Sequence, residues 1–593
     1  MKNKYISIFA SVALAVGASS CVDLDTAPLA QKSEATMWQT VQDAEQGVSI
    51  LYNYMPDAMW SAAEDVYTDN STYGIKWAVD ARCSGLWEPT AFSWSGEYTY
   101  IRYANLVFAH IDEVEDMDEA TRNNVLGQAY FFRAYIYFML IKQFGDVPYF
   151  TEPLNLDDQE DITRTDWKIV YDNVMSDFDN AIKLLPADAA TGRVNSVIAQ
   201  AYKARAALYF ANPECQHYVA DGYQVAANNA KAVIDSGKYD LYGGDYTGTA
   251  ADFDPADYAS MFWDFNVDNS KEGLMEYHRI PGVSGSVYYI GFSAFPKLGW
   301  GGTNPTQDFV DCFEDVEGAP IATSKLYNPL KPNENRDPRL EANVLFSGQT
   351  YYGVEVHTEP LTSSGNTGLY PYGCSDQTLT GYYTLKWLNP DVYPETAGWS
   401  HRSASCDMRF TEVLLTYAEA MNELSPLSEE AFAAVNRVRA RVGMPALQNT
   451  DATKPTYCAT QDDLRQRIRN EWRIEFFAEG DHRQWDIRRW NIAEKVLNTP
   501  RYSMKFKVTN VACPEFGETV PAYKEGETPS WYQDLTLDKE TKVVMRRVVE
   551  LYVGEGQEIT QQFFSYGPHN YVFPVPQHDI DLNKNITQNP GYN

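Results

Sequence analysis

The chain has little positive charge. Its 593 residues carry 48 Lys and Arg against 81 Asp and Glu, which gives a formal net charge of −33 at pH 7. Nucleic-acid-binding proteins neutralise phosphates with clustered Lys and Arg, so this balance argues against a nucleic-acid partner. The same charge opposes adsorption to an anionic membrane, so any membrane attachment requires a localised anchor.

Long apolar runs are also scarce. No stretch after residue 20 reaches the roughly 18 apolar residues that a membrane-spanning helix requires, so we expect no permanent transmembrane helix. The one pronounced apolar segment, residues 5–16, follows Lys2 and Lys4 and is followed by small residues at 17–20. This order is typical of a secretion signal, and we expect residues 1–20 to be a signal peptide.

Cys21 directly follows three small residues, 18–20, and this arrangement resembles the lipobox of bacterial lipoproteins. In a lipobox the cysteine thiol is lipidated and becomes the first residue of the mature protein. The alternative is an ordinary secreted protein, since Ala18 stands where Leu is usual. Each buried acyl CH₂ contributes about 0.8 kcal/mol, so several acyl chains on Cys21 would hold the protein on a membrane essentially permanently. Asp23 and Asp25 resemble signals for export to the cell surface.

Motifs for catalysis and metal binding are missing. The chain has no CxxC pair, HExxH, P-loop or GxSxG elbow, and its eight His are scattered. A glycoside hydrolase would need two facing carboxylates, which 81 acidic residues leave open but which no motif indicates. Asp252, Asp254 and residues 264–268 offer oxygen ligands for Ca²⁺, but they lack the EF-hand order and are better explained as solvated loop. We therefore expect no cofactor and no catalytic residue.

Helical patterns are abundant at both ends of the chain. Residues 40–55 place apolar side chains three and four positions apart, with Thr40 and Asp43 spaced as a capping box. The same reasoning predicts helices at 98–114, 119–144, 165–185, 195–210, 218–236, 407–424, 428–442 and 461–479. They come in pairs, and small residues such as Ala201, Ala204 and Ala207 allow close packing. We therefore predict a mainly α fold, a tetratricopeptide-like superhelix of helical hairpins.

The periodicity disappears between about residues 241 and 405, where Gly, Pro, Tyr, Asn and Asp dominate. Residues 501–572 are similar, with a Val-rich strand predicted around 543–551. Loops this long are usually functional or disordered, and their aromatic content argues against disorder. We therefore predict long loop-rich insertions with a few short strands. The predicted regions are the signal peptide 1–20, a helical region 21–240, and a ligand-facing and helical region 241–593, the last two packed as one unit.

Four segments together resemble the SusD/RagB family of outer-membrane nutrient-binding lipoproteins. The first contains QAYFFRAY at 128–135 and FGDVP at 144–148, and the second contains PTQDFVDCF at 305–313 and NRDPRL at 335–340. The third contains YAEA at 417–420, VNRVR at 435–439, EWRIE at 471–475 and WDIRRW at 485–490. The fourth contains FPVPQ at 573–577 and NPGY at 589–592. These motifs occur in the order found in the family. Three departures stand out: Trp472 replaces a usual Arg, Asp481 is an extra residue after Gly480, and residues 501–572 are long.

This resemblance implies a function without catalysis. It also implies a tetratricopeptide-like helical scaffold with a loop-rich face that binds the ligand. The implied partner is a SusC-like TonB-dependent transporter, over which the protein would sit as a lid. The implied ligand is an oligosaccharide. Two alternatives stay open, a RagB-like peptide-binding protein and an assembly protein that only closes the transporter.

Candidate ligand contacts are the aromatic residues of the aperiodic stretches. A rigid Trp or Tyr can cover the apolar face of a pyranose ring while nearby Asp, Asn and Arg bind its hydroxyls. The first patch consists of Tyr67, Asp69, Asn70, Tyr73, Trp77, Arg82 and Trp87. The second patch consists of Tyr288, Tyr289, Phe292 and Trp300, flanked by Gly299, Gly301 and Gly302. Ordinary burial is the alternative for any one of them.

Several charged and polar residues are expected to be structural instead. Charges alternate in sign at helical spacing through Glu471, Arg473, Glu475, Glu479, Arg483, Asp486, Arg488 and Arg489, as in ion-paired helix faces. Arg133 lies on an otherwise apolar helix and should pair with a buried carboxylate. Trp94, Tyr98 and Asn105 fall on or just before helical spacing and should belong to the core.

Overall fold

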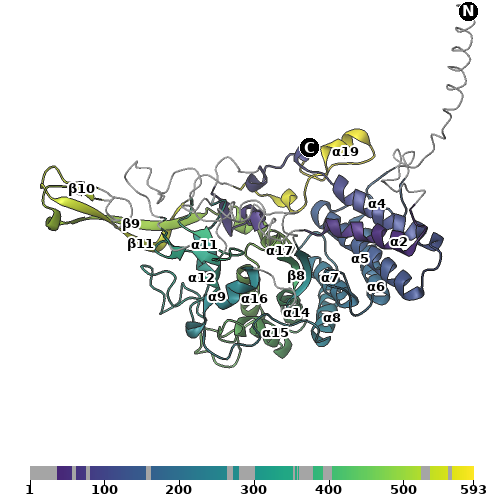
Figure 1. Cartoon of the computed structure of the whole chain (residues 1–593), viewed down its shortest axis with the longest axis horizontal. Helices are drawn as coiled ribbons and strands as arrows, with labels where there is room; N and C mark the ends of the chain where they lie inside the picture. The colour runs from purple at the N-terminus through teal and green to yellow at the C-terminus, as the bar shows by residue number, and fades with distance from the viewer. Residues whose placement is uncertain are drawn as a thin grey trace, which may run out of the picture.

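A computed structural model describes residues 37–56, 62–74, 81–154, 162–263, 271–278, 301–351, 354–356, 358, 378–391, 404–522, 535–558 and 564–592. The predicted signal peptide and Cys21 lie outside these residues. The described chain is mostly helical with short strands, so the predicted fold class is confirmed (Figure 1).

The N-terminal half forms a row of helices close to the predicted ones. They are α2 (Val41–Ser49) with the 3₁₀ turn η2 (Ile50–Tyr54), α4 (Ser95–His110), α5 (Glu119–Phe144), α6 (Trp167–Leu184), α7 (Ser196–Tyr209) and α8 (Gly222–Asp235). The capping box of Thr40 and Asp43 is present, and α5 ends at Gly145 with a φ of 71°. Helix α8 begins four residues later than predicted. A Cβ at Gly222 would lie 2.8 Å from Ala211 Cα, so the first residue of α8 packs closely against the chain that follows α7.

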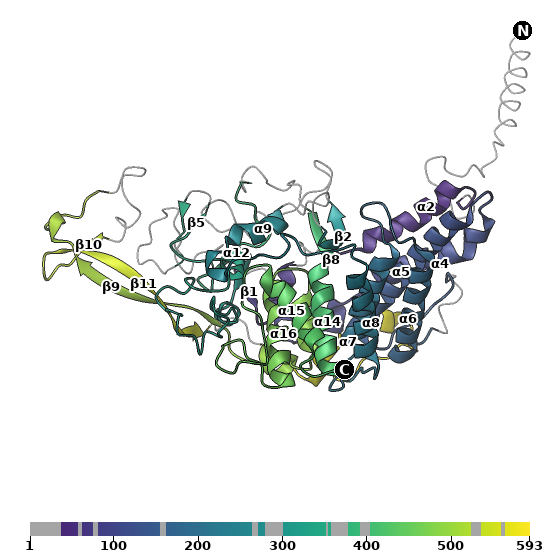
Figure 2. The same ribbon diagram turned by 90° about the horizontal axis from the view of Figure 1, so that it is seen from below.

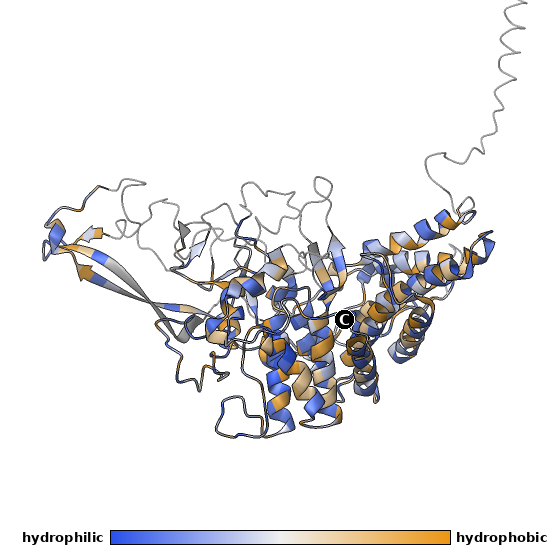
Figure 3. Cartoon of the chain, turned by 60° about the horizontal axis from the view of Figure 1, so that its bottom comes forward, coloured by the Kyte–Doolittle hydropathy of each residue, from blue (hydrophilic) through white to orange (hydrophobic). Residues whose placement is uncertain are grey.

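The C-terminal helices continue this row. Helices α14 (Phe410–Leu424), α15 (Glu429–Ala440) and α16 (Gln461–Glu475) lie beside α7 and α8, and α14 packs against both α8 and α16 (Figure 2). The small residues expected between helices, Ala201, Ala204 and Ala207, are all buried. Every helix of the row carries both apolar and polar residues, as an amphipathic helix must if one side faces the core (Figure 3).

Two predicted helix boundaries in the C-terminal half are also wrong. Residues 407–409 belong to strand β8 (Ala404–Arg409), which pairs with β2 (Gly273–His278), so α14 starts only at Phe410. Helix α16 ends at Glu475 rather than at 479, and the chain turns through Ala478, which has a φ of 52°, into the separate helix α17 (His482–Arg489). Contacts with other parts of the chain decide both boundaries, and the helical spacing of apolar residues does not predict such contacts.

The strands are short except in one arm. Strand pairs are β1 (Ser71–Tyr73) with β3 (Thr303–Pro305), β4 (Val344–Leu345) with β7 (Tyr383–Thr384), and β5 (Thr350–Tyr351) with β6 (Val354–Glu355). The arm has the order β10-β11-β9, formed by β9 (Tyr502–Ala512), β10 (Leu535–Leu537) and β11 (Val544–Glu558), and it projects away from the helices (Figure 1). The predicted Val-rich strand is thus confirmed. The remaining short helices are α9 (Pro255–Trp263), α11 (Gln307–Asp311), α12 (Arg339–Asn343), α18 (Ala493–Leu497) and α19 (Gln577–Leu582).

The largest hydrophobic core joins residues from both ends of the chain, from Trp38 to Tyr592. Trp94 and Asn105 are buried in this region, so the prediction that they are structural is confirmed. Arg133 is also buried and is held by Asp177, with Nε–Oδ2 and Nη2–Oδ1 distances of 2.7 and 2.9 Å. Its Nη1 donates to Asn105 Oδ1 at 3.0 Å. Arg133 therefore has the buried carboxylate partner that its position on an apolar helix predicts.

A buried ionic lattice connects the C-terminal helices to the middle of the chain. Its members are Glu272, Glu314, Asp337, Arg339, Lys386, Arg409, Arg439, Arg441, Glu471, Glu475 and Glu479, each at most 4% exposed. Glu475 on α16 is shared by three guanidinium groups: Arg339 and Arg409 each donate to it at 3.0 Å, and Arg441 donates as well. Glu471, Glu475 and Glu479 are therefore paired with Arg and Lys side chains of other elements. Asp486 and Arg489, by contrast, pair three residues apart along one helix, as the alternating charges predict.

Burial by itself would raise the pKa of Glu475. The neighbouring Arg441, Arg409 and Arg339 outweigh that effect and hold the pKa well below its usual range. The Glu475 carboxylate is therefore ionised, and it is paired with three charged arginine side chains.

We expect the change Glu475→Ala to lower the free energy of unfolding by about 3–5 kcal/mol, because it leaves buried guanidinium groups without their shared carboxylate. Urea unfolding followed by circular dichroism measures the loss. The control is Asp235→Ala, which removes an exposed ion pair with Lys231 and should change stability little. Equal losses in the two variants would contradict a central role for Glu475.

Candidate ligand-binding site

The structure describes most of the first predicted patch and none of the second. Trp77 lies outside the described residues, as do Tyr288, Tyr289, Phe292 and Trp300. Tyr67 ends the 3₁₀ turn η3 (Ala62–Tyr67), Tyr73 ends β1, and Arg82 lies in the 3₁₀ turn η5 (Ala81–Ser84). The other described members, Asp69, Asn70 and Trp87, lie outside helices and strands.

Strand β1 brings the first patch next to the end of the second. It runs antiparallel to β3, with Ser71 opposite Pro305 and Tyr73 opposite Thr303. The Gly74 amide donates to the Gly302 carbonyl oxygen at 3.1 Å. A Cβ at Gly74 would lie 1.9 Å from the Gly301 carbonyl oxygen, so only glycine permits this approach. The chain immediately after Trp300 therefore lies against the chain immediately after Tyr73.

Asp69 and Asn70 attach the first patch to α16 and α17. Asp69 accepts two hydrogen bonds from Arg483, both 2.8 Å long, and lies 3.0 Å from Arg473 Nη2. Arg473 also donates to Asn70 Oδ1 at 2.7 Å. Burial would raise the pKa of Asp69, but Arg473 and Arg483 outweigh it and hold the pKa well below its usual range. These residues hold the patch rigidly on the helical scaffold.

The other described members of the patch differ in exposure. Trp87 is 8% exposed and packs against Phe573 at a ring distance of 5.0 Å. Tyr67 is buried, and the Arg82 guanidinium lies 4.6 Å from the centre of its ring. Tyr73 and Arg82 are half-buried. Ligand contact by any of these residues stays a prediction, and Tyr73 and Arg82 are the described members with the most accessible surface.

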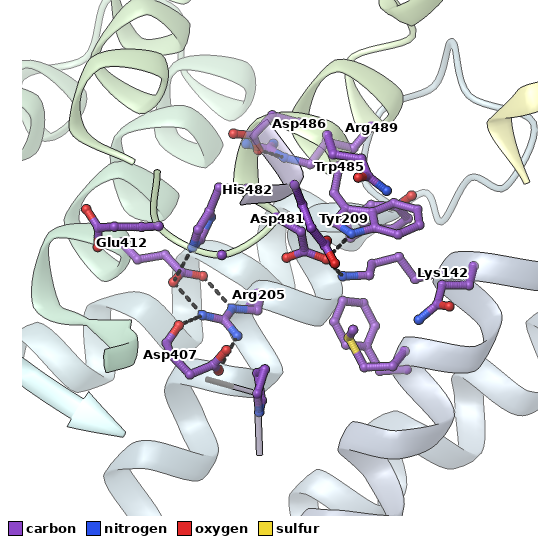
Figure 4. Close-up of a pocket in the computed structure, with 18 of the residues that line it drawn as sticks. Lys142, Arg205, Tyr209, Asp407, Glu412, Asp481, His482, Trp485, Asp486 and Arg489 are labelled. Carbon is purple, nitrogen blue, oxygen red and sulfur yellow. Dashed lines mark hydrogen bonds and ion pairs between the residues drawn. The ribbon is translucent and has the colours of Figure 1, made fainter. Parts of the chain in front are cut away.

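A cavity of about 260 Å³ lies in the centre of the molecule, close to this patch. Its walls come from α5, α7, the junction of β8 with α14, and the turn from Glu479 into α17, as Figure 4 shows. Arg82 of the first patch also lines it. The cavity residues were not predicted as a group. Lys142 and Arg205 are nevertheless charged residues on largely apolar helices, which is the pattern that singled out Arg133.

Ion pairs cover part of the cavity wall. Arg205 lies between Asp407, at 2.8 Å, and Glu412, at 2.6 Å (Figure 4). His482 Nε2 is 3.7 Å from Glu412. Across the cavity, Lys142 Nζ lies 3.5 Å from Asp481 and 4.4 Å from the centre of the Trp485 ring.

The cavity carries more negative than positive charge. The acidic lining residues are Glu64, Asp407, Glu412, Glu479, Asp481 and Asp486, and the Lys and Arg residues are Arg82, Lys142, Arg205 and Arg489. Burial, followed by the nearby Arg205, lowers the pKa of His482 well below its ordinary value, so this ring is neutral. Burial raises the pKa of Asp486 to about 6 although Arg489 opposes the shift.

Asp252 and Asp254 accept hydrogen bonds from their own loop, and residues 264–268 lie outside the described residues. Asp252 accepts from the Thr249 hydroxyl at 2.7 Å, and Asp254 accepts from the Ala256 amide at 2.9 Å. Within the part of the chain that the structure describes, no three His, Cys, Asp or Glu gather as a metal site would require. In the same residues, no helix is both long and apolar enough to cross a bilayer.

Comparisons with known proteins point to one family. The model described as "SusD family" matches residues 260–592, more than half of the chain, and the model described as "Starch-binding associating with outer membrane" matches residues 24–208. A SusD-like protein of Formosa agariphila is 27% identical over 417 residues, which are 68% of this chain and 72% of that protein.

Solved structures show the same fold. A SusD-like protein of Bacteroides fragilis has a TM-score of 0.71 at 24% identity, covering 96% of this chain and all of that one. A structure described as a laminarin-binding SusD-like protein has a TM-score of 0.58 at 20% identity, covering 93% of this chain and all of that one. At these identities the likeness concerns the fold.

Asp65, next to the first patch, makes stability depend on pH. Its buried carboxylate accepts from the Ala478 amide at 2.7 Å, and burial raises its pKa from 3.8 to about 7. Between these two values only the unfolded chain ionises at this position, so the folded state loses stability as the pH rises through that window. We expect Asp65→Asn to gain stability relative to the parent from about pH 4 to 7, by about 1 kcal/mol or more, and then to level off. Parallel unfolding curves of the two proteins across this range would contradict the shift.

Proposed function

The chain belongs to the SusD family, and from this premise we propose that it is a cell-surface lipoprotein that captures an oligosaccharide and delivers it to a SusC-like TonB-dependent transporter. Binding rather than catalysis is the proposed activity. The two family matches support it because they cover both halves of the chain and one is described by starch binding and association with the outer membrane. One structurally similar protein is described as a laminarin-binding SusD-like protein, which adds support for a glycan as the ligand.

The observation that carries the proposal is the contact between Gly74, which follows Tyr73 of the first patch, and the glycines that follow Trp300 of the second. Because Gly74 lies against Gly301 and Gly302, the strand that ends the described part of the first patch adjoins the chain that follows Trp300. We infer from this contact that the two aromatic-rich stretches, more than 200 residues apart in sequence, form one glycan-binding surface. A convergent aromatic surface is what a glycan longer than one ring requires.

The residues of the patches take different roles in this proposal. Asp69 and Asn70, held by Arg473 and Arg483, position the segment. Tyr73, Trp77, Tyr288, Tyr289 and Trp300 would stack on sugar rings, and Arg82 would donate to hydroxyls. The ion pairs of Asp69 keep the segment preorganised, so little ordering entropy is lost on binding.

Anchoring completes the proposal. Lipidation at Cys21 would hold the protein on the outer membrane, because several acyl chains on one cysteine give essentially permanent attachment. Export to the outer surface would place the glycan-binding edge outside the cell, and the transporter would receive the ligand from it.

We expect Trp77→Ala and Trp300→Ala each to weaken oligosaccharide binding by at least about tenfold, or about 1.4 kcal/mol, as loss of an aromatic anchor does. Isothermal titration against a glycan panel that includes laminarin and starch fragments measures this. Tyr218→Ala, which removes an exposed aromatic ring near α8, is the matched control and should bind normally. Heat released only by a peptide mixture, or reducing sugar released from the glycans, would refute glycan capture without catalysis.

For the anchor, Cys21→Ser should move the protein from the membrane fraction to the soluble fraction after cell lysis. Cys215→Ser, a change at a half-buried thiol that forms no disulfide, should leave it in the membrane fraction. Protease added to intact cells should degrade the parent protein. Protection of the parent from protease would place it on the inner side of the outer membrane and contradict surface capture.

A further inference from the structure

We propose that Asp308 and Arg473 form a hydroxyl-binding pair beside the first patch and hold one sugar ring of the glycan there. The inference rests on the proposed function, because it adds a specific polar contact to the surface site. Free and accessible hydrogen-bonding atoms on two side chains that the scaffold keeps apart carry it.

Asp308 lies on α11, shortly after the strand that pairs with the first patch. Strand β3 runs beside β1, and Thr306 then donates its amide to the Asn70 carbonyl oxygen at 2.8 Å and its hydroxyl to the Asp69 carbonyl oxygen at 2.7 Å. The chain reaches Asp308 two residues later, near enough to Asp69 for the two carboxyl groups to influence each other. Asp308 therefore lies beside the part of the patch that the scaffold holds most firmly.

The Asp308 carboxylate is free to bind a ligand. The residue is half-buried, and it makes no hydrogen bond or ion pair with the residues that the structure describes. Neither of its oxygens is closed off from solvent, in contrast to unpaired interior atoms such as Asp486 Oδ2. Both oxygens can therefore accept a hydrogen bond from outside the protein.

Arg473 supplies a free donor near this acceptor. Its Nε donates to Asn70 Oδ1 at 2.7 Å, and its Nη2 lies 3.0 Å from Asp69 Oδ2. These contacts fix the guanidinium, which influences Asp308 by its charge but forms no ion pair with it. Arg473 Nη1 makes no hydrogen bond with a described residue, and it too is open to solvent.

A fixed donor and a fixed acceptor that do not reach each other suit a hydroxyl group. A sugar hydroxyl accepts a hydrogen bond from a guanidinium and donates one to a carboxylate, so one hydroxyl or two adjacent ones satisfy both side chains. An ammonium ion would satisfy only Asp308, and an anion only Arg473. Water serves both groups as well, and a glycan hydroxyl that replaces it keeps charge-assisted hydrogen bonds.

The charge of Asp308 makes this contact depend on pH. Burial raises the pKa of Asp308 from 3.8 to about 6. The charged groups that face it are Arg473, Asp69, Asp311 and Arg501. Above its pKa the carboxylate accepts hydrogen bonds with its full charge, and below it the protonated group loses that advantage. Glycan affinity should therefore fall as the pH is lowered through about 6.

The test is isothermal titration of the parent and of Asp308→Asn with laminarin and starch fragments at about pH 5 and about pH 7.5. We expect the variant to bind about tenfold more weakly at the higher pH, since it loses a hydrogen bond to a charged group. The parent should weaken toward the variant at the lower pH, whereas the variant should change little. Asp311→Asn is the matched control, because Asp311 is also half-buried on α11 but already accepts from Gln307 Nε2 at 2.7 Å. It should keep both the affinity and the pH dependence of the parent.

Trp77→Ala separates this contact from the surface site as a whole. Weak binding by Trp77→Ala together with normal binding by Asp308→Asn would overturn the inference and leave the proposed function intact. Equal losses in Asp308→Asn and Asp311→Asn, or a parent affinity that is the same at both pH values, would also overturn it. A parent protein that binds no glycan would overturn both proposals.

Discussion

The sharing of one buried carboxylate by three arginines is the interaction on which the rest of the structure depends. Glu475 ends α16 and receives Arg339, Arg409 and Arg441, which come from α12, the end of β8 and the end of α15. A single buried charge is costly, but a buried set of matched charges is stable. Removal of any one member therefore leaves the charges of the others uncompensated. The lattice thereby fixes the relative positions of elements that are far apart in the sequence.

The central cavity and the first patch both follow from the place where this lattice ends. After Glu479, which pairs with Arg409 and Lys386, the chain turns through Gly480 into α17. That turn forms one wall of the central cavity. Helices α16 and α17 then supply Arg473 and Arg483, which hold Asp69 and with it the first aromatic patch. The scaffold signature therefore positions the first patch, and the proposed hydroxyl-binding pair, Asp308 and Arg473, belongs to it.

The first patch and the central cavity adjoin each other. The pairing of β1 with β3 brings Gly74, which follows Tyr73 of the first patch, against Gly301 and Gly302. The cavity opens toward the surface at Asp481, and its wall carries more carboxylates than Lys and Arg side chains. Arg82 connects the patch with the cavity, because it lies over Tyr67 in the surface patch and also lines the cavity.

Local sequence patterns determined the helices, because amphipathic spacing, caps and the glycine at position 145 act within a few residues. The span of α5, the capping box at Thr40, the buried pairing expected of Arg133 and the membership of the family could all be read in this way. Only the tertiary structure decided that 407–409 form a strand, that α16 stops at Glu475, and which charges pair. Ion pairs and cavities join residues hundreds of positions apart, such as Asp69 and Arg483, and no spacing along the chain encodes that contact.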